Sequence, residues 1–201
     1  AGADVRDYAC HCDTLSFCFS KGLGAPVGSV LTGDAETIDR AHRYRKMLGG
    51  GMRQAGILAA AANYAIDHHL ERLREDHERA RHFREALEDA PGITFPLPSP
   101  TNIVFLDVPD APRFVARLNE RGVLAGATGP NRIRVVFHLD VDDDGLERAI
   151  AVFRETVARF SPQQSEAPAS TGPTSASATG VSCSLAPILM CMIQLPPVEP
   201  Q

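Results

Sequence analysis

The chain has 201 residues, of which 44% are hydrophobic and 22% charged, and a formal net charge of −5. This length and composition are typical of a globular protein with one or two domains. The negative charge argues against a nucleic-acid partner, and no apolar run approaches the roughly 20 residues of a membrane helix. Five cysteines lack the spacing of a disulfide scaffold, which favours reduced thiols and a cytoplasmic location: Cys10, Cys12, Cys18, Cys183 and Cys191.

The start of the chain predicts a pair of strands around a lysine. The sequence begins at Ala1 without an initiator methionine or a signal peptide, so we expect it to be part of a longer protein. Strands are expected over 15–19 and 27–31, in a hairpin-like pair. Residues 34–46 have apolar side chains at helical spacing, and three glycines follow at 49–51.

A helical pattern then runs from residue 52 to 89 and ends at Pro91 and Gly92. Because such a helix would span about 57 Å, longer than a small domain, we expect a bend and a passage between two domains. Its apolar stripe includes Ile57 and Tyr64. Its second half is rich in charges, Asp76 among them, which predicts a solvated outer face.

The remaining pattern predicts a small α+β domain and a tail. Strands are expected over 93–95, 102–108, 123–127 and 132–138, and helices over 111–121 and 143–160, the last with Asp143 or Asp144 as N-cap. Residues 161–201 are rich in Ser, Pro, Ala and Thr and nearly uncharged, which is typical of a disordered low-complexity tail. We therefore expect three regions: the end of a large ligand-binding domain (1–75), a small C-terminal domain (76–160) and the tail (161–201).

The segment SKGLGAPVGS, residues 20–29, places Lys21 directly after a strand expected to be buried. Lysine is rarely buried without a partner or a function, and burial favours the neutral amine that can form an imine. Gly22, Gly24 and Gly28 would remove side chains that block a flat ligand. These features indicate a pyridoxal phosphate site, although an exposed loop lysine beside turn glycines fits the same residues.

Three further segments accompany it: RKMLGGGMRQ (45–54), PTNIVF (100–105) and IRVVFHLDV (133–141). In this order and at these separations, the four segments resemble the low-specificity threonine aldolases, which are fold type I lyases that use pyridoxal phosphate. The resemblance extends from about residue 13 to about residue 160 and covers the C-terminal part of such an enzyme. It implies an α/β fold of the aspartate-aminotransferase-like class: the end of the large domain, a long connecting helix and a small α+β C-terminal domain.

The resemblance also implies roles for cationic residues. Lys21 would bind pyridoxal phosphate covalently, and Arg53, expected to open the long helix, would contact the phosphate, often across a subunit boundary. Lys46 would lie near the active site and assist with phosphate or water. An ordinary surface lysine in a run of basic residues is an equally consistent interpretation of Lys46. Arg134 would bind the substrate carboxylate through two parallel N–H···O bonds, with Arg132 as a rival on the same strand face.

Three other residues of these segments are expected to have supporting roles. Asn102 is expected to hold backbone near the site, although an ordinary strand-start asparagine is equally consistent. Phe137 stands where the family usually has threonine. His138 is expected to be structural. No metal is expected, because a calcium-loop pattern that opens at Asp140 lacks its final glutamate and Cys10-His11-Cys12 lacks a second ligand pair.

The implied activity is retro-aldol cleavage of a β-hydroxy amino acid, L-threonine or L-allo-threonine, to glycine and acetaldehyde. The resemblance implies a homotetramer with sites at dimer interfaces. The family's ring-pairing aspartate, stacking aromatic group and hydroxyl-binding histidines lie upstream and have no match here. A catalytically inactive remnant or interaction module is therefore the alternative function, and another β-eliminating lyase is the second alternative.

Overall fold

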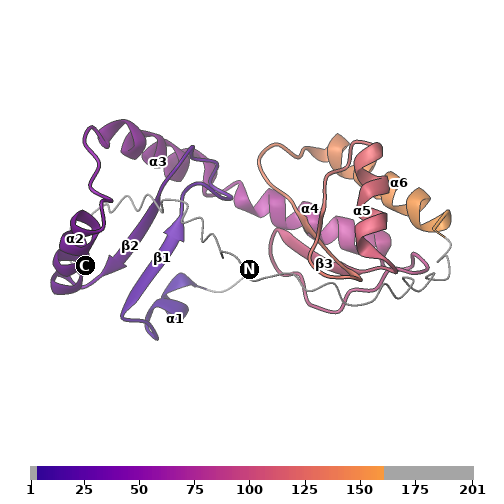
Figure 1. The fold of residues 1–201 in the computed structure, drawn as a ribbon, viewed down its shortest axis with the longest axis horizontal. Coiled ribbons are helices and arrows are strands. Elements are labelled where there is room, and N and C mark those ends of the chain that lie inside the picture. The colour runs from indigo at the N-terminus through magenta and orange to yellow at the C-terminus, as the bar shows by residue number, and fades with distance from the viewer. Residues whose placement is uncertain (1–3, 161–201) are drawn as a thin grey trace, which may run out of the picture.

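The computed structural model describes residues 4–160, and the tail predicted over 161–201 lies outside them. The N-terminal half contains α1 (Val5–Ala9), β1 (Thr14–Cys18), β2 (Ser29–Gly33), α2 (Ala35–Met47) and α3 (Gly56–His69) (Figure 1). β1 and β2 form an antiparallel two-stranded sheet in which Phe17 faces Val30. The predicted strand pair around the lysine turn is confirmed.

The N-terminal core is small and depends on alanine. It consists of buried residues from the hairpin and α3: Phe19, Leu23, Ala25, Val30, Ala62 and Ala65. The apolar stripe expected on this helix is wrong, because Ile57 and Tyr64 are 78% and 58% exposed. Alanine side chains let α3 approach the hairpin closely, and the larger side chains are left on the outer face.

The single long helix expected over 52–89 is two helices, α3 and α4 (Leu73–Leu87). Between them the backbone N–H groups of residues 73, 74 and 75 donate to the carbonyls of residues 70, 71 and 72. These i to i+3 bonds make a tight turn of 3₁₀ type, which supplies the expected bend. α4 continues into the C-terminal half, as Figure 1 shows.

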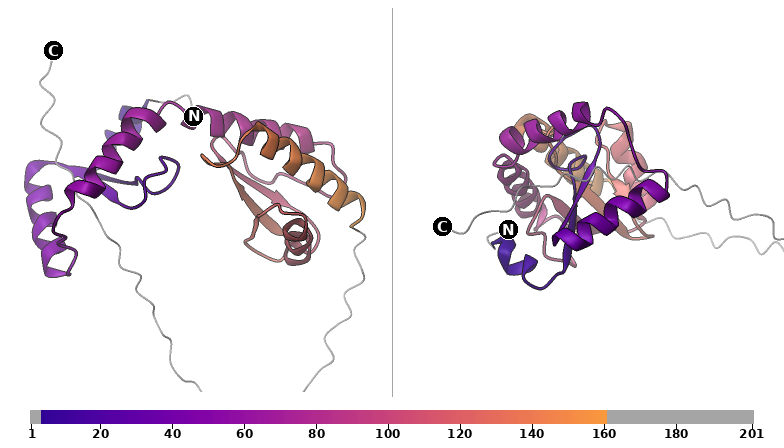
Figure 2. Two further views of the ribbon diagram at one scale, coloured as in Figure 1. Left: turned by 90° about the horizontal axis from the view of Figure 1, so that it is seen from above. Right: turned by 90° about the vertical axis from the view of Figure 1, so that its left-hand side faces the viewer.

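The C-terminal half contains β3 (Ile103–Asp107), α5 (Ala111–Glu120), β4 (Gly126–Ala127), β5 (Arg132–Val136) and α6 (Asp143–Ala158). The strands form an antiparallel sheet in the order β3-β5-β4, and α4 and α6 run side by side over it (Figure 2). Fully buried Phe153 lies at the centre of this second core, with ring centroids 5.0 Å from Phe83 and 5.8 Å from Phe114.

Several sequence expectations for this half need correction. The strand expected over 93–95 is a single bridge between Thr94 and Asp107, and the strand expected over 123–127 is reduced to two residues. The N-cap of α6 is Asp142, whose side chain accepts from the Gly145 N–H at 2.8 Å, rather than Asp143 or Asp144. Among the described helices, none is long and apolar enough to cross a membrane. The domain boundary at residue 75 stays a prediction.

Candidate functional site

Lys21 lies in the loop that joins β1 to β2, and backbone hydrogen bonds fix the shape of this loop. The Gly24 N–H donates to the Lys21 carbonyl at 2.9 Å, and the Ala25 N–H donates to the Phe19 carbonyl at 3.0 Å. The Lys21 side chain is exposed and makes no hydrogen bond or ion pair with residues 4–160. The expectation of a buried lysine is therefore wrong within the described residues.

The glycines of the loop serve packing and backbone conformation. A Cβ atom on Gly22 would come within 3.0 Å of Leu73, and one on Gly24 within 3.1 Å of Leu139. Gly24 and Gly28 also have positive φ angles of 69° and 118°, which favour glycine. The interpretation that Gly22 and Gly24 leave room for a flat ligand is wrong, because side chains of the same chain already fill that space.

The contact with Leu139 brings the segment that follows β5 to the lysine turn. Asn102 ties this segment to the start of β3: its side-chain N–H donates to the Phe137 carbonyl at 2.8 Å, and the Phe137 N–H donates back to the Asn102 carbonyl at 2.9 Å. Asn102 therefore holds backbone, as either sequence interpretation expects, and its place near a functional site stays a prediction. Phe137 is buried against Phe83, so at this position the chain makes an apolar contact.

The two arginines of β5 lie on the same face of the sheet but differ in their partners. The Arg132 guanidinium donates twice to Asp107, at 2.8 and 3.0 Å, and this hydrogen bonding lowers the pKa of the Asp107 carboxyl. Arg134 is exposed and has no side-chain partner among residues 4–160. Because Arg132 is already engaged, Arg134 is the β5 cation available to an anionic ligand.

The triple glycine ends α2 rather than opening α3. The N–H of Gly49 donates to the Lys46 carbonyl at 3.2 Å, and that of Gly50 donates to the Arg45 carbonyl at 2.8 Å. With φ of +79° at Gly49, these bonds form a Schellman motif. Two of the three glycine N–H groups are therefore occupied. α3 begins only at Gly56, so the expectation that Arg53 opens the helix is wrong: it lies in the preceding loop.

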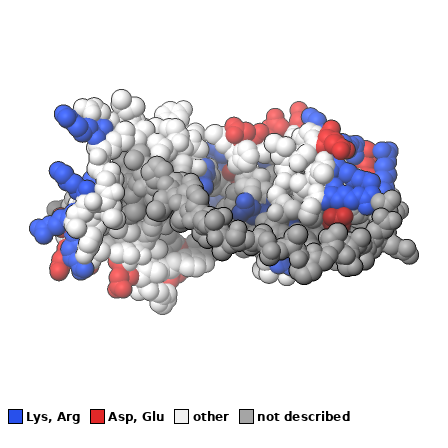
Figure 3. All heavy atoms as spheres, in the orientation of Figure 1, with Lys and Arg blue, Asp and Glu red and all other residues white. Residues whose placement is uncertain are grey.

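Arg53 and Lys46 are exposed, and they lie at the opposite end of α3 from the lysine turn. The turn contacts the C-terminal end of α3 through His69, whereas Arg53 precedes its first residue. The 14 residues of α3 span about 20 Å. Figure 3 shows basic side chains gathered over α2, which contributes Arg40, Arg43, Arg45 and Lys46. The structure thus brings together the Lys21 turn and the segment that follows β5, but not Arg53 or Lys46.

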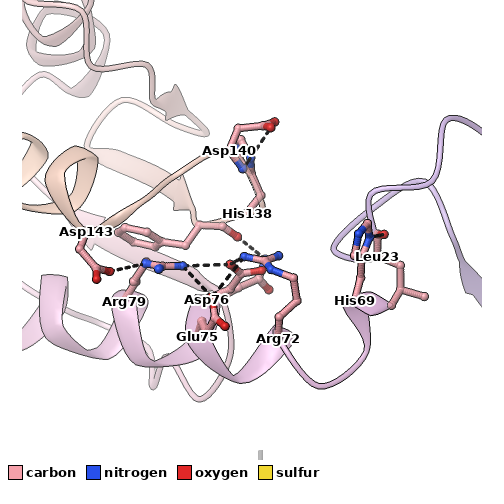
Figure 4. Close-up of polar contacts among 11 residues, drawn as sticks. Leu23, His69, Arg72, Glu75, Asp76, Arg79, His138, Asp140 and Asp143 are labelled. Carbon is pink, nitrogen blue, oxygen red and sulfur yellow. Dashed lines mark hydrogen bonds and ion pairs between the residues drawn. The ribbon is translucent and has the colours of Figure 1, made fainter. Parts of the chain in front are cut away.

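Sequence reasoning missed two residues near the junction of α3 and α4, Asp76 and His69. Asp76, expected on a solvated face, is fully buried: its Oδ1 lies 3.2 Å from Arg72 Nη2 and 3.9 Å from Arg79 Nη1 (Figure 4). The spacing Arg72, Asp76, Arg79 could have shown this cluster, because i+3 and i+4 neighbours meet on a helix. His69 bonds to the lysine turn, and no sequence signal marked it.

Other candidate sites in the described part of the chain contain none of the predicted residues. A groove of about 860 Å³ is lined by Pro109, Pro130 and Phe160 among others, far along the sequence from Lys21. Within residues 4–160 no three His, Cys, Asp or Glu side chains are grouped to hold a metal ion. The roles of Lys21 and Arg134 therefore stay predictions.

Comparison with known proteins identifies relatives of this chain. The chain is 41% identical over 160 residues to the low specificity L-threonine aldolase of Escherichia coli O157:H7, which covers 79% of this chain and 47% of that protein. It is 38% identical over 160 residues to the probable low-specificity L-threonine aldolase 2 of Arabidopsis thaliana, covering 77% and 45%. The chain thus spans about half the length of these curated relatives.

The fold comparison agrees with the sequence comparison. A PLP-dependent aminotransferase from Streptococcus suis 89-1591 superposes with a TM-score of 0.57 at 18% identity, covering 75% of this chain and 43% of that one. The α/β fold of the aspartate-aminotransferase-like class is confirmed. The family model for beta-eliminating lyases matches residues 1–111, which is more than half of the chain. The chain therefore belongs to the beta-eliminating lyase family.

Proposed function

We propose that this chain is part of a threonine aldolase, a carbon–carbon lyase that uses pyridoxal phosphate to cleave L-threonine or L-allo-threonine to glycine and acetaldehyde. The relatives at 41% and 38% identity support this activity within the family. The observation that carries the proposal is the Lys21 turn. Its amine has no ion pair among residues 4–160, and its hydrogen-bonded loop packs against Leu139, which follows the strand that contains Arg134.

Two residues of the chain meet the chemical requirements of pyridoxal phosphate and its amino-acid substrate: Lys21 and Arg134. The aldehyde requires an amine that is free of ion pairs, and Lys21 has none among the described residues. The substrate carboxylate requires a guanidinium that is free of other carboxylates. Arg134 meets this requirement and Arg132, bonded to Asp107, does not.

Each residue then has a definite task. Lys21 would hold pyridoxal phosphate through its side-chain nitrogen until the amino acid takes its place. When bound, pyridoxal phosphate supplies an electron sink for the pair left as the Cα–Cβ bond breaks. Arg134 holds the substrate carboxylate through two parallel N–H···O bonds, which orients the amino acid.

Arg53 would contact the cofactor phosphate from a second copy of the chain. Within one chain α3 separates it from the lysine turn by about 20 Å. A homo-oligomer, dimer or tetramer, is therefore part of the proposal, and Lys46, in the last turn of α2, would add positive charge there. The division at residue 75 and a cytoplasmic location also remain proposals.

Reductive trapping tests the cofactor site sharply, because the chain has only two lysines, Lys21 and Lys46. The purified chain is incubated with pyridoxal phosphate, reduced with borohydride and mapped by peptide mass spectrometry. We expect the reduced cofactor on Lys21, loss of the label in Lys21→Ala and retention in the control Lys46→Ala. Equal labelling of both lysines would contradict the proposal, since it would indicate non-specific reaction with exposed amines.

The second assay follows the products of L-threonine. Glycine with acetaldehyde supports the aldolase, and a 2-oxo acid with ammonia would support another β-eliminating lyase. Trapping at Lys21 without product formation would support the inactive remnant.

Arg134→Gln should raise KM roughly 100-fold, because it removes two charge-assisted hydrogen bonds to the carboxylate. Arg132→Gln is the matched control and should change KM less than about threefold, because that arginine already binds Asp107. Similar KM values for the two variants would contradict the assignment of Arg134.

A further inference from the structure

The imidazole of His69, the last residue of α3, hydrogen-bonds to the backbone of the lysine turn. Its Nδ1 lies 2.7 Å from the Leu23 carbonyl oxygen, and Figure 4 shows the ring directed at that oxygen. A carbonyl oxygen can only accept, so Nδ1 carries the hydrogen and donates it. This bond connects two segments that are 46 residues apart in the sequence.

The hydrogen bond acts on the peptide unit between Leu23 and Gly24. The carbonyl of this unit accepts from His69, and its N–H donates to the Lys21 carbonyl at 2.9 Å. The two bonds form a continuous chain from α3 to the backbone of Lys21, and bonds in such a chain polarise and strengthen one another. A Cβ atom on Gly24 would lie 3.6 Å from His69 Nδ1, so the ring also packs against the turn.

The bond from His69 adds to the other contacts of the turn, which are the buried side chains of Leu23 and Ala25 and the bond from the Ala25 N–H to the Phe19 carbonyl. Leu23 is 8% exposed, so its carbonyl would be poorly hydrated if His69 were lost. The Lys21 side chain is exposed and makes no hydrogen bond or ion pair with residues 4–160 that would position its amine. The direction in which the amine points therefore depends on the backbone of the turn.

We propose that His69 is a positioning residue for Lys21, which holds the turn against the end of α3 through the Leu23 carbonyl. This inference rests on the proposed function in one respect, namely that Lys21 is the residue that binds pyridoxal phosphate. The hydrogen bond itself can be tested without the cofactor.

The test compares three variants of the full chain. His69→Leu removes the donor, His69→Asn keeps an N–H at the position of Nδ1, and His68→Leu is the control. His68 is adjacent on the same helix and stacks on Tyr64, at 4.2 Å between ring centroids. Two quantities are measured: the exchange rate of the Gly24 amide by NMR without cofactor, and the Kd for pyridoxal phosphate with borohydride trapping at Lys21. Amides of α6 serve as the reference for global opening.

In His69→Leu we expect the Gly24 amide to exchange about tenfold faster and the Kd to rise about tenfold, as for the loss of one hydrogen bond to a buried acceptor. His69→Asn should restore both values to within about threefold of the wild type, and His68→Leu should leave them unchanged. These comparisons are made after normalising to the α6 amides, so a general loss of stability does not produce the expected pattern.

Three results would overturn the proposal: unchanged Gly24 exchange in His69→Leu, exchange in His69→Asn as fast as in His69→Leu, or a Kd that does not follow the exchange rate. A different result separates the two claims. If the wild-type chain takes up no cofactor at Lys21 while exchange of the Gly24 amide follows the expected pattern, the proposed function is wrong. The hydrogen bond by which His69 fixes the turn is then still supported.

Discussion

Substitution of Asp76 tests the charged cluster beside the junction of α3 and α4. Asp76→Ala removes a fully buried carboxylate that lies 3.2 Å from Arg72 and 3.9 Å from Arg79. Both arginine side chains are only 16% exposed. Arg79 keeps a 2.8 Å bond to Asp143, whereas Arg72 keeps only a 3.7 Å contact with half-exposed Glu75.

The expected cost follows from the charge that is left behind. Breaking a buried ion pair by removing one partner costs about 3–5 kcal/mol. Because only Arg72 loses its short contact, and alanine favours the helix by up to about 0.7 kcal/mol, we expect a net loss of about 3 kcal/mol. In urea unfolding followed by circular dichroism, this is a midpoint shift of about 1–2 M.

Glu75→Ala is the matched control, since Glu75 is adjacent on α4 and contacts the same two arginines at 3.7 and 3.6 Å. Its side chain is 54% exposed, so its removal should cost less than about 1 kcal/mol. The reasoning is refuted if the two variants unfold at the same urea concentration, because burial of the carboxylate would then have no energetic consequence.

Two further predictions concern backbone conformation and pH. Gly49→Ala should destabilise the chain by about 1 kcal/mol, because alanine is strained at a φ of +79° and no atom lies within 4 Å of the new Cβ to offset the strain by packing. Gly56→Ala, in the first turn of α3, should stabilise the chain by up to about 1 kcal/mol. Equal urea midpoints for the two variants would contradict both expectations. Burial lowers the pKa of His77, so the folded chain resists protonation and its stability should fall as pH drops below about 6.5, the ordinary value. His77→Gln should remove this part of the pH dependence of the urea midpoint, and an unchanged slope between pH 7 and pH 5 would count against it.

The elements could be predicted well from the sequence where local signals are strong. The hairpin strands, α2 with its N-cap Asp34, α5 and α6 appear within a few residues of their expected positions. Prediction failed where a short segment depends on its neighbours. β4 is two residues long and the strand expected over 93–95 is one bridge, because strand length is decided by the partner available for pairing.

The sequence alone determined the family and the fold class, because ordered motifs can be recognised in any conformation of the chain, and it predicts Lys21 and Arg134 as site residues. Only the tertiary structure decided which of the two β5 arginines is free, since Asp107 reaches Arg132 from another strand. It also decided that Asp76 is buried and that His69 holds the lysine turn. Burial and long-range hydrogen bonds depend on segments that are distant along the chain. The local spacing of Arg72, Asp76 and Arg79 indicates their ion pairs but not the burial of Asp76.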